Sequence, residues 1–521
     1  MKKLNIESSV FWPTVFVFIL MSVMLLVGGD NLYRVLASIL STITNQFGWV
    51  YLWIYIANFV FLFWLAFSKF GSIRFGKSDE KPEYGNFAWF CMVFTTGIDA
   101  SIMIMSLFEP IRYLEAPPFG VEPFSESAYD YAHMYGQFHW GPMAWMMYIP
   151  ATIAIAYTLY VKKAQTTRIS SSCIALDGPG RVKKVLRSML DIFVVMGIMG
   201  GISASIGLEI PVISEIVGIM TGYPNTLGLK LAMLIVLLVL FGSTVYMGLD
   251  KGIQVLSSIN VYVVLGFLAV MFIAGPTLYI IDLQTNSVGL LLSNFVRMST
   301  YTDPNLKSGF AQNWTTFYWG WWLAYMPVMG LFVARISRGR TVKQVILGQM
   351  AWGSLGCMTF FAIMGGYSLH LQKSGIVDLA HILNTQGQEA AIGAVVATLP
   401  FKTVMMIVYC ISCFVFLATT VSSAAYILAS MTSKKLSGYE QPPRWNRILW
   451  AIVFVLFSAG IIVVGGFETI QVVCVVAGFP LALVCIVLMQ SILKMFKSHK
   501  ANYGGYEGLN AGEAEHVQTW D

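Results

Sequence analysis

Charged residues are scarce in this chain of 521 residues: only 11% are Asp, Glu, Lys or Arg, whereas 57% are hydrophobic. Soluble domains carry about 25% charged residues, so this composition excludes an ordinary soluble multidomain protein. The mean hydropathy of +0.70 indicates a polytopic membrane protein instead. The net charge of +6 is then explained by Lys and Arg in loops rather than by a surface for nucleic acid.

Other chemical signatures are missing as well. The seven cysteines lie mostly inside apolar runs, which favours buried small residues over disulfides or metal ligands. No loop is long enough to form a nucleotide-binding domain of its own, so direct ATP drive is not expected. Enzymes that work within membranes usually show clustered His, Glu or Asp at metal-ligand spacing, and we find no such cluster. We therefore expect no enzyme activity, cofactor or metal. A membrane-embedded enzyme or an osmosensor stays the weaker alternative.

Apolar runs of about 20 residues predict an all-α polytopic protein with twelve membrane spans. These runs lie near residues 10–28, 50–68, 87–114, 136–160, 188–207, 228–247, 257–281, 313–334, 345–367, 403–431, 447–465 and 469–493. Lys and Arg gather in the even-numbered loops, while residues 116–135 and 208–227 contain none. By the positive-inside rule, both termini are predicted to face the cytoplasm.

The spans divide the chain into five parts. We expect two N-terminal helices (1–86), spans three to seven (87–281), an external interfacial helix and loop (282–312), spans eight to twelve (313–494), and a disordered cytoplasmic tail (495–521). A broken third span and an aromatic eighth span lie five spans apart. This spacing suggests two inverted five-helix repeats, an arrangement that places a binding site near the membrane midplane.

The eighth span carries an aromatic stripe. On a helix, residues at steps of three and four share one face, which here joins Trp314, Tyr318, Trp321, Tyr325 and Met329 and is widened by Trp322. Aromatic anchors normally collect at the two membrane interfaces, but Trp321, Trp322 and Tyr325 fall near mid-span. Ring faces at that depth suit a poorly hydrated cation such as a quaternary ammonium group.

The fourth span places Trp140, Trp145 and Tyr148 within two turns, with Pro142 positioned to kink the backbone. These rings could close a box with those of the eighth span, although aromatics in helical bundles also serve as plain packing. His139 could relay protons, or it could be a hydrogen-bonded structural histidine.

The third span contains an ionisable residue, Asp99, about halfway along, beside a Gly97 that can interrupt the helix. A charge at that depth is costly, so it faces a cavity or a partner. Asp99 is therefore a candidate proton or cation site, and helix capping is the alternative. In the tenth span, Thr419 and Thr420 could offer oxygens to sodium, or simply bond to carbonyls of the preceding turn.

At these residues the chain closely resembles the betaine/choline/carnitine transporter family over nearly its whole length. The motifs that carry the resemblance are FYWGWWLAYMP with ARISRGRT (317–327 and 334–341), GLDKGI (248–253), FHWGP (138–142) and EAPPFG (115–120). The resemblance implies a LeuT-like core of two inverted five-helix repeats, formed by spans 3–7 and 8–12, with two additional N-terminal helices, trimeric assembly and alternating access.

Carried over to this sequence, the family's aromatic box falls on Trp140, Trp145, Tyr148, Trp321, Trp322 and Tyr325. Tyr325 and Met329 are similar to the family's carnitine/γ-butyrobetaine exchanger. However, the arginine that replaces a sodium ion there falls on the uncharged Asn260, and Asp99 matches an aspartate of the proton-coupled choline carriers. Thr419 and Thr420 match hydroxyls of a sodium site. Arg112 stands where the exchanger has a substrate tyrosine, and a pocket-facing arginine would favour a zwitterion.

We therefore expect a multi-pass transporter of the cytoplasmic (inner) membrane that carries a quaternary ammonium substrate of the carnitine, betaine and choline class. The main expectation is proton-coupled symport by alternating access in a homotrimer. Substrate exchange and sodium coupling are the alternatives. The expected partners are the substrate, the coupling ion and the lipid bilayer, with no nucleic acid.

Overall fold

The computed structural model describes residues 6–96, 99–164, 168–247, 251–305, 308–434 and 441–503. Within these ranges every regular element is a helix, which confirms the all-α class. Three features of the sequence lie outside the described residues: Gly97, the first three residues of GLDKGI, and the part of the predicted disordered tail after residue 503.

The helices of the first half of the chain lead up to the loop before residue 311. They are α1 (Ser8–Val27), α2 (Gly29–Phe67), α3 (Asn86–Thr96), α4 (Ala100–Glu115), η1 (Pro118–Gly120), α5 (Glu126–Trp140), α6 (Pro142–Tyr160), α7 (Ile169–Ser172), η2 (Ile174–Leu176), α8 (Arg181–Thr221), α9 (Leu227–Met247), α10 (Lys251–Ala274) and α11 (Thr277–Thr300).

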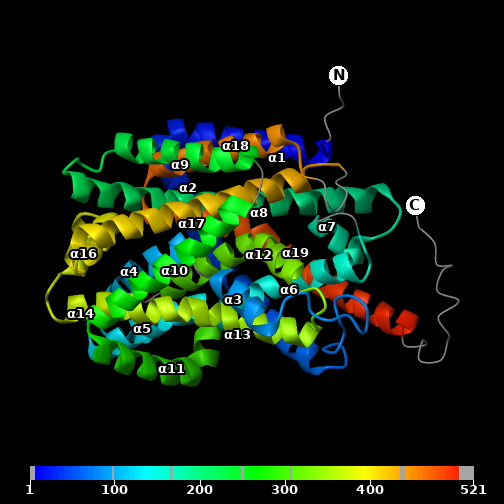
Figure 1. Cartoon of the computed structure of the whole chain (residues 1–521), viewed down its shortest axis with the longest axis horizontal. Coiled ribbons are helices and arrows are strands. Elements are labelled where there is room, and N and C mark those ends of the chain that lie inside the picture. Colours follow the sequence, from blue (N-terminus) through cyan, green and yellow to red (C-terminus); the bar gives the residue numbers. More distant parts are fainter. Residues whose placement is uncertain are drawn as a thin grey trace.

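The helices of the second half begin with a single π-helical turn. They are η3 (Ala311–Thr315), α12 (Thr316–Ile336), α13 (Val342–Phe360), η4 (Phe361–Gly365), α14 (Gly366–Lys373), α15 (Leu379–Thr385), α16 (Gln388–Ala397), α17 (Lys402–Met431), α18 (Arg444–Val464) and α19 (Phe467–Tyr503). Figure 1 shows most of the long helices running along the longest axis of the molecule, with α6, α12 and α19 in the middle of the view. Helix α12 packs against α6, α19 and α8, so the aromatic helix lies at the centre of the bundle.

Nine of the described helices are long and apolar enough to cross a membrane, and the broken pair α3–α4 makes a tenth. Two predicted spans are not among them. In α9 the apolar segment Leu227–Gly242 is too short to cross a membrane. In α12 the many Trp and Tyr side chains are less apolar than Leu or Ile, although the helix is almost entirely buried. The count of twelve spans and the two inverted repeats therefore stay predictions.

Two predicted boundaries are wrong. The tail predicted to be disordered from residue 495 is helical up to Tyr503, where α19 ends. The seventh span was expected to run from 257 to 281, but α10 ends at Ala274 because Gly275 and Pro276 interrupt the helix. The next helix, α11, begins at Thr277 and covers the predicted interfacial segment 282–300. Its buried side chains recur at helical spacing, as expected for an amphipathic helix (Ile280, Leu283, Ser287 and Leu291 among them). Figure 1 shows α11 along one edge of the bundle.

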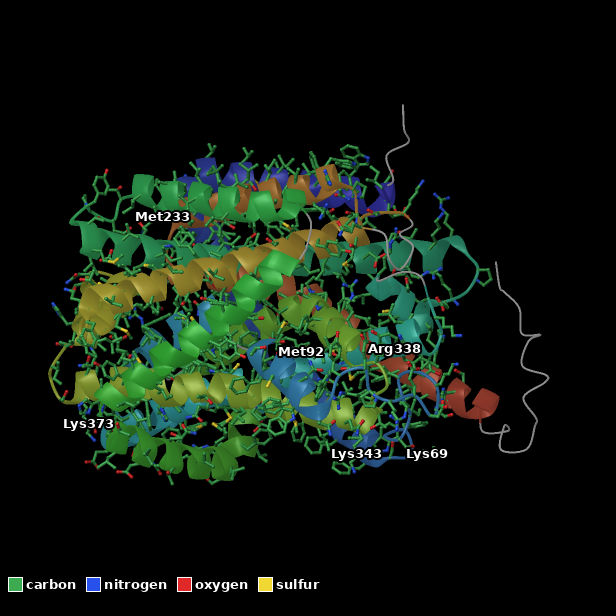
Figure 2. All side chains as sticks on the ribbon, in the orientation of Figure 1. Lys69, Met92, Met233, Arg338, Lys343 and Lys373 are labelled. Atoms are coloured by element: carbon green, nitrogen blue, oxygen red, sulfur yellow. The ribbon has the colours of Figure 1, made fainter. Side chains whose placement is uncertain are left out.

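The basic loops meet at one end of the molecule. Figure 2 shows Lys69, Arg338 and Lys343 at this end and Lys373 at the other. The loops after α2 and after α12 are joined there by the Arg338–Glu80 ion pair, with Nε to Oε1 at 2.6 Å. A hydrogen bond from the backbone N–H of Lys77 and the pairing with Arg338 lower the pKa of Glu80. The clustering agrees with the predicted topology, while the side of the membrane that this end faces stays a prediction.

The loop after α2 also matches the phosphate-binding motif GxxxxGK[ST] at residues 71–78, GSIRFGKS. A true phosphate-binding loop connects a strand to a helix. Here the segment follows α2, and no helix begins before Asn86. The backbone N–H of Lys77 donates to the Glu80 carboxylate at 2.9 Å, so an internal acid is bound where a phosphate would be expected. The match is therefore not a nucleotide site.

The glycines of α8 allow close helix packing, as the sequence predicts. A Cβ added at Gly200 would lie 2.5 Å from the Cβ of Ala477 on α19, and one at Gly207 would lie 2.6 Å from Ile461 on α18. Such distances leave no room for a methyl group. Because these two glycines have no side chain, α19 and α18 can pack directly against the backbone of α8.

Candidate functional site

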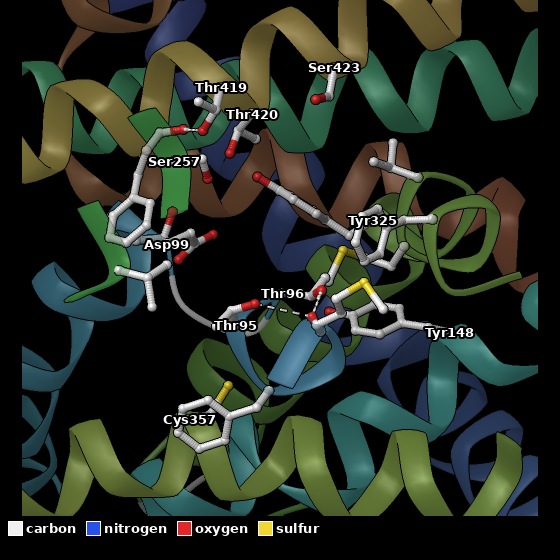
Figure 3. Close-up of a pocket in the computed structure, with 18 of the residues that line it drawn as sticks. Thr95, Thr96, Asp99, Tyr148, Ser257, Tyr325, Cys357, Thr419, Thr420 and Ser423 are labelled. Carbon is white, nitrogen blue, oxygen red and sulfur yellow. Dashed lines mark hydrogen bonds between the residues drawn. The ribbon is translucent and has the colours of Figure 1, made fainter. Parts of the chain in front are cut away.

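A cavity of about 690 Å³ lies between α3, the start of α4, and helices α6, α10, α12, α13 and α17. Figure 3 shows it with Asp99, Ser257, Thr419 and Thr420 on one side of the view and Tyr148 and Tyr325 on the other. Ten of the twelve predicted site residues line this one cavity: Trp140, Trp145, Tyr148, Trp321, Trp322, Tyr325, Asp99, Met329, Thr419 and Thr420. The residues come from four separate parts of the sequence, and the fold brings them together.

The wall contributed by α12 is built from two parallel rings. Trp321 and Trp322 stack with ring centroids 5.4 Å apart and planes 5° apart. The indole Nε1 of Trp322 donates to the carbonyl of His139 at 2.8 Å, which fixes the ring against the end of α5. The Nε1 of Trp321 is buried and has no hydrogen-bond partner among the described residues. Trp314 and Tyr318 share the predicted stripe but do not line the cavity.

The opposite aromatic group follows from the break at Gly141. Helix α5 ends at Trp140 and α6 begins at Pro142, which occupies the first turn where a missing N–H costs nothing. The predicted kink at Pro142 is therefore a helix boundary. It places Trp140 edge-on to Trp322, and it leaves Trp145 and Tyr148 on the next turn of α6, 5.5 Å apart.

Trp145 is held by a glycine on the neighbouring helix. A Cβ added at Gly353 of α13 would lie 2.2 Å from the Cδ2 of Trp145 and 2.3 Å from its Cε3. The ring therefore lies flat on the α13 backbone. The indole fills the space that Gly353 leaves without a side chain, and this close packing holds Trp145 at the cavity wall.

Trp140 is positioned by a buried carboxylate that sequence analysis missed. Glu109 of α4 accepts hydrogen bonds from the hydroxyls of Tyr113 and Tyr318, and from Trp140 Nε1 at 3.4 Å. His139 donates or accepts at Tyr113 and at Thr315, 2.8 and 3.1 Å away, which is the structural alternative named for this histidine. The signal that could have found Glu109 is the one that singled out Asp99, an acid inside an apolar run.

Asp99 caps a helix and also faces the cavity. Helix α3 ends at Thr96 and α4 begins at Ala100, with the two axes bent by 57°. The Asp99 Oδ1 accepts from the backbone N–H of Ile102 at 3.0 Å, so the capping alternative is confirmed. Asp99 is also among the residues that line the cavity. Capping and a role in the cavity are thus compatible.

Hydroxyl groups line the cavity near Asp99. Thr419, Thr420 and Ser423 of α17 and Ser257 of α10 all contribute to the lining. The hydroxyl of Thr419 donates to the carbonyl of Phe416 at 2.8 Å, which is the bonding to the preceding turn that was the alternative to a sodium ligand. Its oxygen can still accept or coordinate, because a hydroxyl has two lone pairs.

Two predicted site residues lie elsewhere. Arg112 is near the end of α4, where its guanidinium bonds to Glu115 Oε2 at 2.9 Å and to Asn384 Oδ1 at 2.7 Å. Asn260 is buried on α10 and donates to the carbonyl of Ser412 at 3.0 Å. Neither lines the cavity. Within the described lining, Arg335 is the one Lys or Arg and Asp99 the one carboxylate.

Cys91 on α3 also lines the cavity. Its side chain is partly exposed, whereas the other six cysteines of the chain are buried.

The sequence was also compared with models of known protein families. The family model described as the betaine/carnitine/choline family transporter matches residues 9–501. The match spans every helix that contributes to the cavity, from α3 to α17.

Proposed function

The chain belongs to the betaine/carnitine/choline family of membrane transporters. We propose that it transports a quaternary ammonium compound, which binds in the aromatic cavity. We further propose that transport is driven by protons that bind at Asp99. Members of this family are transporters and not enzymes. The observation that carries the proposal is one cavity lined both by eight Trp and Tyr side chains, the six of the predicted box among them, and by one carboxylate. Ring faces attract the trimethylammonium head without requiring hydrogen bonds from it.

The charges around the cavity favour a substrate with net positive charge. Arg112, which the sequence suggested as a carboxylate-binding group, pairs with Glu115 and Asn384 away from the cavity. Arg335, the cation of the described lining, is in the last turn of α12, more than two turns beyond Tyr325. Asp99 itself lines the cavity, together with Ser101 in the first turn of α4. We therefore propose choline, which carries a net positive charge, as a better substrate than the zwitterions carnitine and betaine.

Asp99 is the proposed coupling site because its protonation state affects both the binding of the cation and the closing of the cavity. While ionised, it attracts both a proton and the cationic substrate. Protonation removes a buried charge and so lowers the cost of closing the cavity around the substrate. The predicted cycle therefore alternates between an open, ionised state and a closed, protonated and loaded state.

Two alternatives rest on other lining residues. Met329 favours exchange, because the resemblance to the family's exchanger implies that its thioether takes the place of a coupling ion. Thr419 and Thr420 favour sodium, because their hydroxyl oxygens lie in the lining together with Asp99. Exchange requires substrate on the far side of the membrane, whereas symport does not.

The test is uptake of labelled choline into proteoliposomes, with carnitine and betaine as competitors and the neutral carbon analogue of choline as a control. Uptake driven by an inward proton gradient without internal substrate supports the proposal. Uptake only against internal substrate supports exchange, and dependence on sodium supports the third reading. Failure of the wild-type protein to bind any of the three quaternary ammonium compounds would exclude the proposed substrate class.

A further inference from the structure

A line of hydroxyl groups connects the cavity wall to a buried acid on α8. The hydroxyl of Tyr325 lies 2.7 Å from the Oγ of Ser205, and Ser205 lies 3.2 Å from the Oγ of Ser101. Ser101 in turn donates to Oε1 of Glu209 at 2.6 Å. Tyr325 and Ser101 both line the cavity. The residues therefore form one hydrogen-bonded chain from the substrate wall to Glu209.

Glu209 has no counterion in the described structure. Only 2% of the residue is exposed, and its Oε2 has no hydrogen-bond partner among the described residues. The titratable groups that interact with it electrostatically are Asp99 before α4, Tyr325 on α12, and Tyr409 and Cys413 on α17. None of these is a cation. A carboxylate so placed in a membrane protein is costly to ionise and is normally functional.

The protonation state of Glu209 determines which group donates in each of these hydrogen bonds, because each hydroxyl has only one proton to donate. When Glu209 is ionised, it only accepts. Ser101 then donates to it, Ser205 can donate to Ser101, and the proton of Tyr325 is used on Ser205. When Glu209 is protonated, it can donate to Ser101. Ser101 then donates to Ser205, and Ser205 donates to Tyr325. Hydrogen bonds aligned in this way reinforce one another.

We propose that Glu209 is a second proton-binding site, and that its protonation frees the hydroxyl of Tyr325 to donate to an oxygen of the substrate. The inference rests on the proposed function, since it assigns Tyr325 to the substrate wall. One proton enters from the water of the cavity and binds to the Glu209 carboxylate. The three hydroxyls between Glu209 and the cavity keep one proton each and only reverse their direction. Choline, betaine and carnitine each offer an oxygen to accept from Tyr325.

The direct test is the pH dependence of choline binding, followed by tryptophan fluorescence of the purified protein. Choline has no group that titrates between about pH 6 and pH 9, so any dependence belongs to the protein. The measurement is made in the Asp99→Asn background, which removes the attraction of the Asp99 carboxylate for proton and substrate. There we expect affinity to be highest at low pH and to fall by up to about tenfold per pH unit where Glu209 loses its proton. Adding Glu209→Gln leaves a side chain that can always donate to Ser101, so this protein should bind at the low-pH affinity throughout.

Tyr325→Phe provides a second variant that leaves the carboxylate in place. It lacks the donor, so in the same Asp99→Asn background we expect affinity at low pH to be weaker by about two- to tenfold and to be independent of pH. Proton uptake on choline binding, measured with an indicator dye, should accompany binding by Asp99→Asn and be absent when either variant is combined with it. Elution of each variant as a single species in detergent checks that it is folded.

The matched control is Glu215→Gln. Glu215 lies on the same helix and accepts from Asn225 at 2.7 Å, outside the chain of hydroxyls, so its replacement should leave the pH dependence unchanged. Asp99→Asn separates the two proposals: its equilibrium binding should still depend on pH through Glu209, while its proton-driven uptake falls.

Several outcomes would overturn the role of Glu209. It is wrong if, in the Asp99→Asn background, the pH dependence survives in both Glu209→Gln and Tyr325→Phe, or if Asp99→Asn by itself abolishes it; in either case the proposed function still stands. Absence of binding of choline, betaine and carnitine by the wild type overturns both proposals together.

Discussion

The ring of Trp140 stands edge-on against Trp322, with centroids 4.7 Å apart and planes at 73°. At this distance the two rings are in contact, so no cation fits between them. The faces that remain for a substrate are those turned to the cavity. Trp140 therefore supports Trp322 edge-on and also lines the cavity, while Trp322 and Trp321 are the rings whose faces we expect to meet the substrate.

Replacing Trp322 should weaken choline binding, and a conservative replacement should do so without preventing folding. Trp322→Phe keeps a ring but lowers its electron density, and Trp322→Ala removes a cation–π contact, which corresponds to about a 2- to 30-fold loss of affinity. Trp319→Phe is the control. Trp319 is fully buried and stacks on Tyr55 at 4.1 Å, but it does not line the cavity. Equal losses in Trp322→Ala and Trp319→Phe would indicate that the rings only pack.

Gly353→Ala should disturb the site through Trp145. The new methyl group would overlap the indole, and such overpacking costs about 1–3 kcal/mol and moves the ring. The control on the same helix is Gly348→Ala, where the added Cβ would lie 2.4 Å from the ring of Trp89, outside the cavity. Both variants should lose thermal stability, and only Gly353→Ala should lose choline affinity. Similar affinity in the two variants would remove Trp145 from the site.

Asp99→Asn should uncouple transport from protons while keeping the helix. Asn caps helices about as well as Asp, so the bond to the N–H of Ile102 is preserved. Uptake into proteoliposomes should fall to the level seen without a proton gradient, whereas counterflow of substrate should continue. Asp99→Ala should in addition cost about 1 kcal/mol of stability. Undiminished proton-driven uptake by Asp99→Asn would contradict the role of this residue.

Arg112→Ala should leave the ratio of choline to carnitine affinity unchanged within about twofold. Arg112 is partly exposed and pairs with Glu115, and exposed pairs of this kind contribute about 0–1 kcal/mol. Competition binding of the two ligands measures the ratio. A selective loss of carnitine binding would show that the guanidinium reaches the substrate in a state other than the one described.

Helix periodicity predicts which aromatic residues share a face, and Trp321, Trp322 and Tyr325 are neighbours on any helix. Their pairing with Trp140, Trp145 and Tyr148 in one box is what the family resemblance implies. The six side chains do line one cavity, and their role in binding a substrate stays a prediction. The all-α class and the break before Asp99 follow equally from hydrophobic runs and local helix breakers. The end of α10 could also have been read from Gly275–Pro276.

The remaining features depend on tertiary contacts that periodicity does not contain. A position at the end of α4 says nothing about the direction of the long Arg112 side chain, which its partner Asn384, far along the chain, determines. Asn260 similarly turns to a carbonyl of α17. The chain from Tyr325 to Glu209 joins three helices, and no local pattern predicts which serine bridges them.

The partly exposed Cys91 gives the molecule a native chemical reporter. Cys357 lines the same cavity but is buried, as are the other five thiols, so a water-soluble maleimide should react first at Cys91, without any cysteine being removed or added. The labelling rate then follows the opening of the cavity to the reagent. Protection by choline would report occupancy, and its loss in a chosen variant would show which residue closes the entrance.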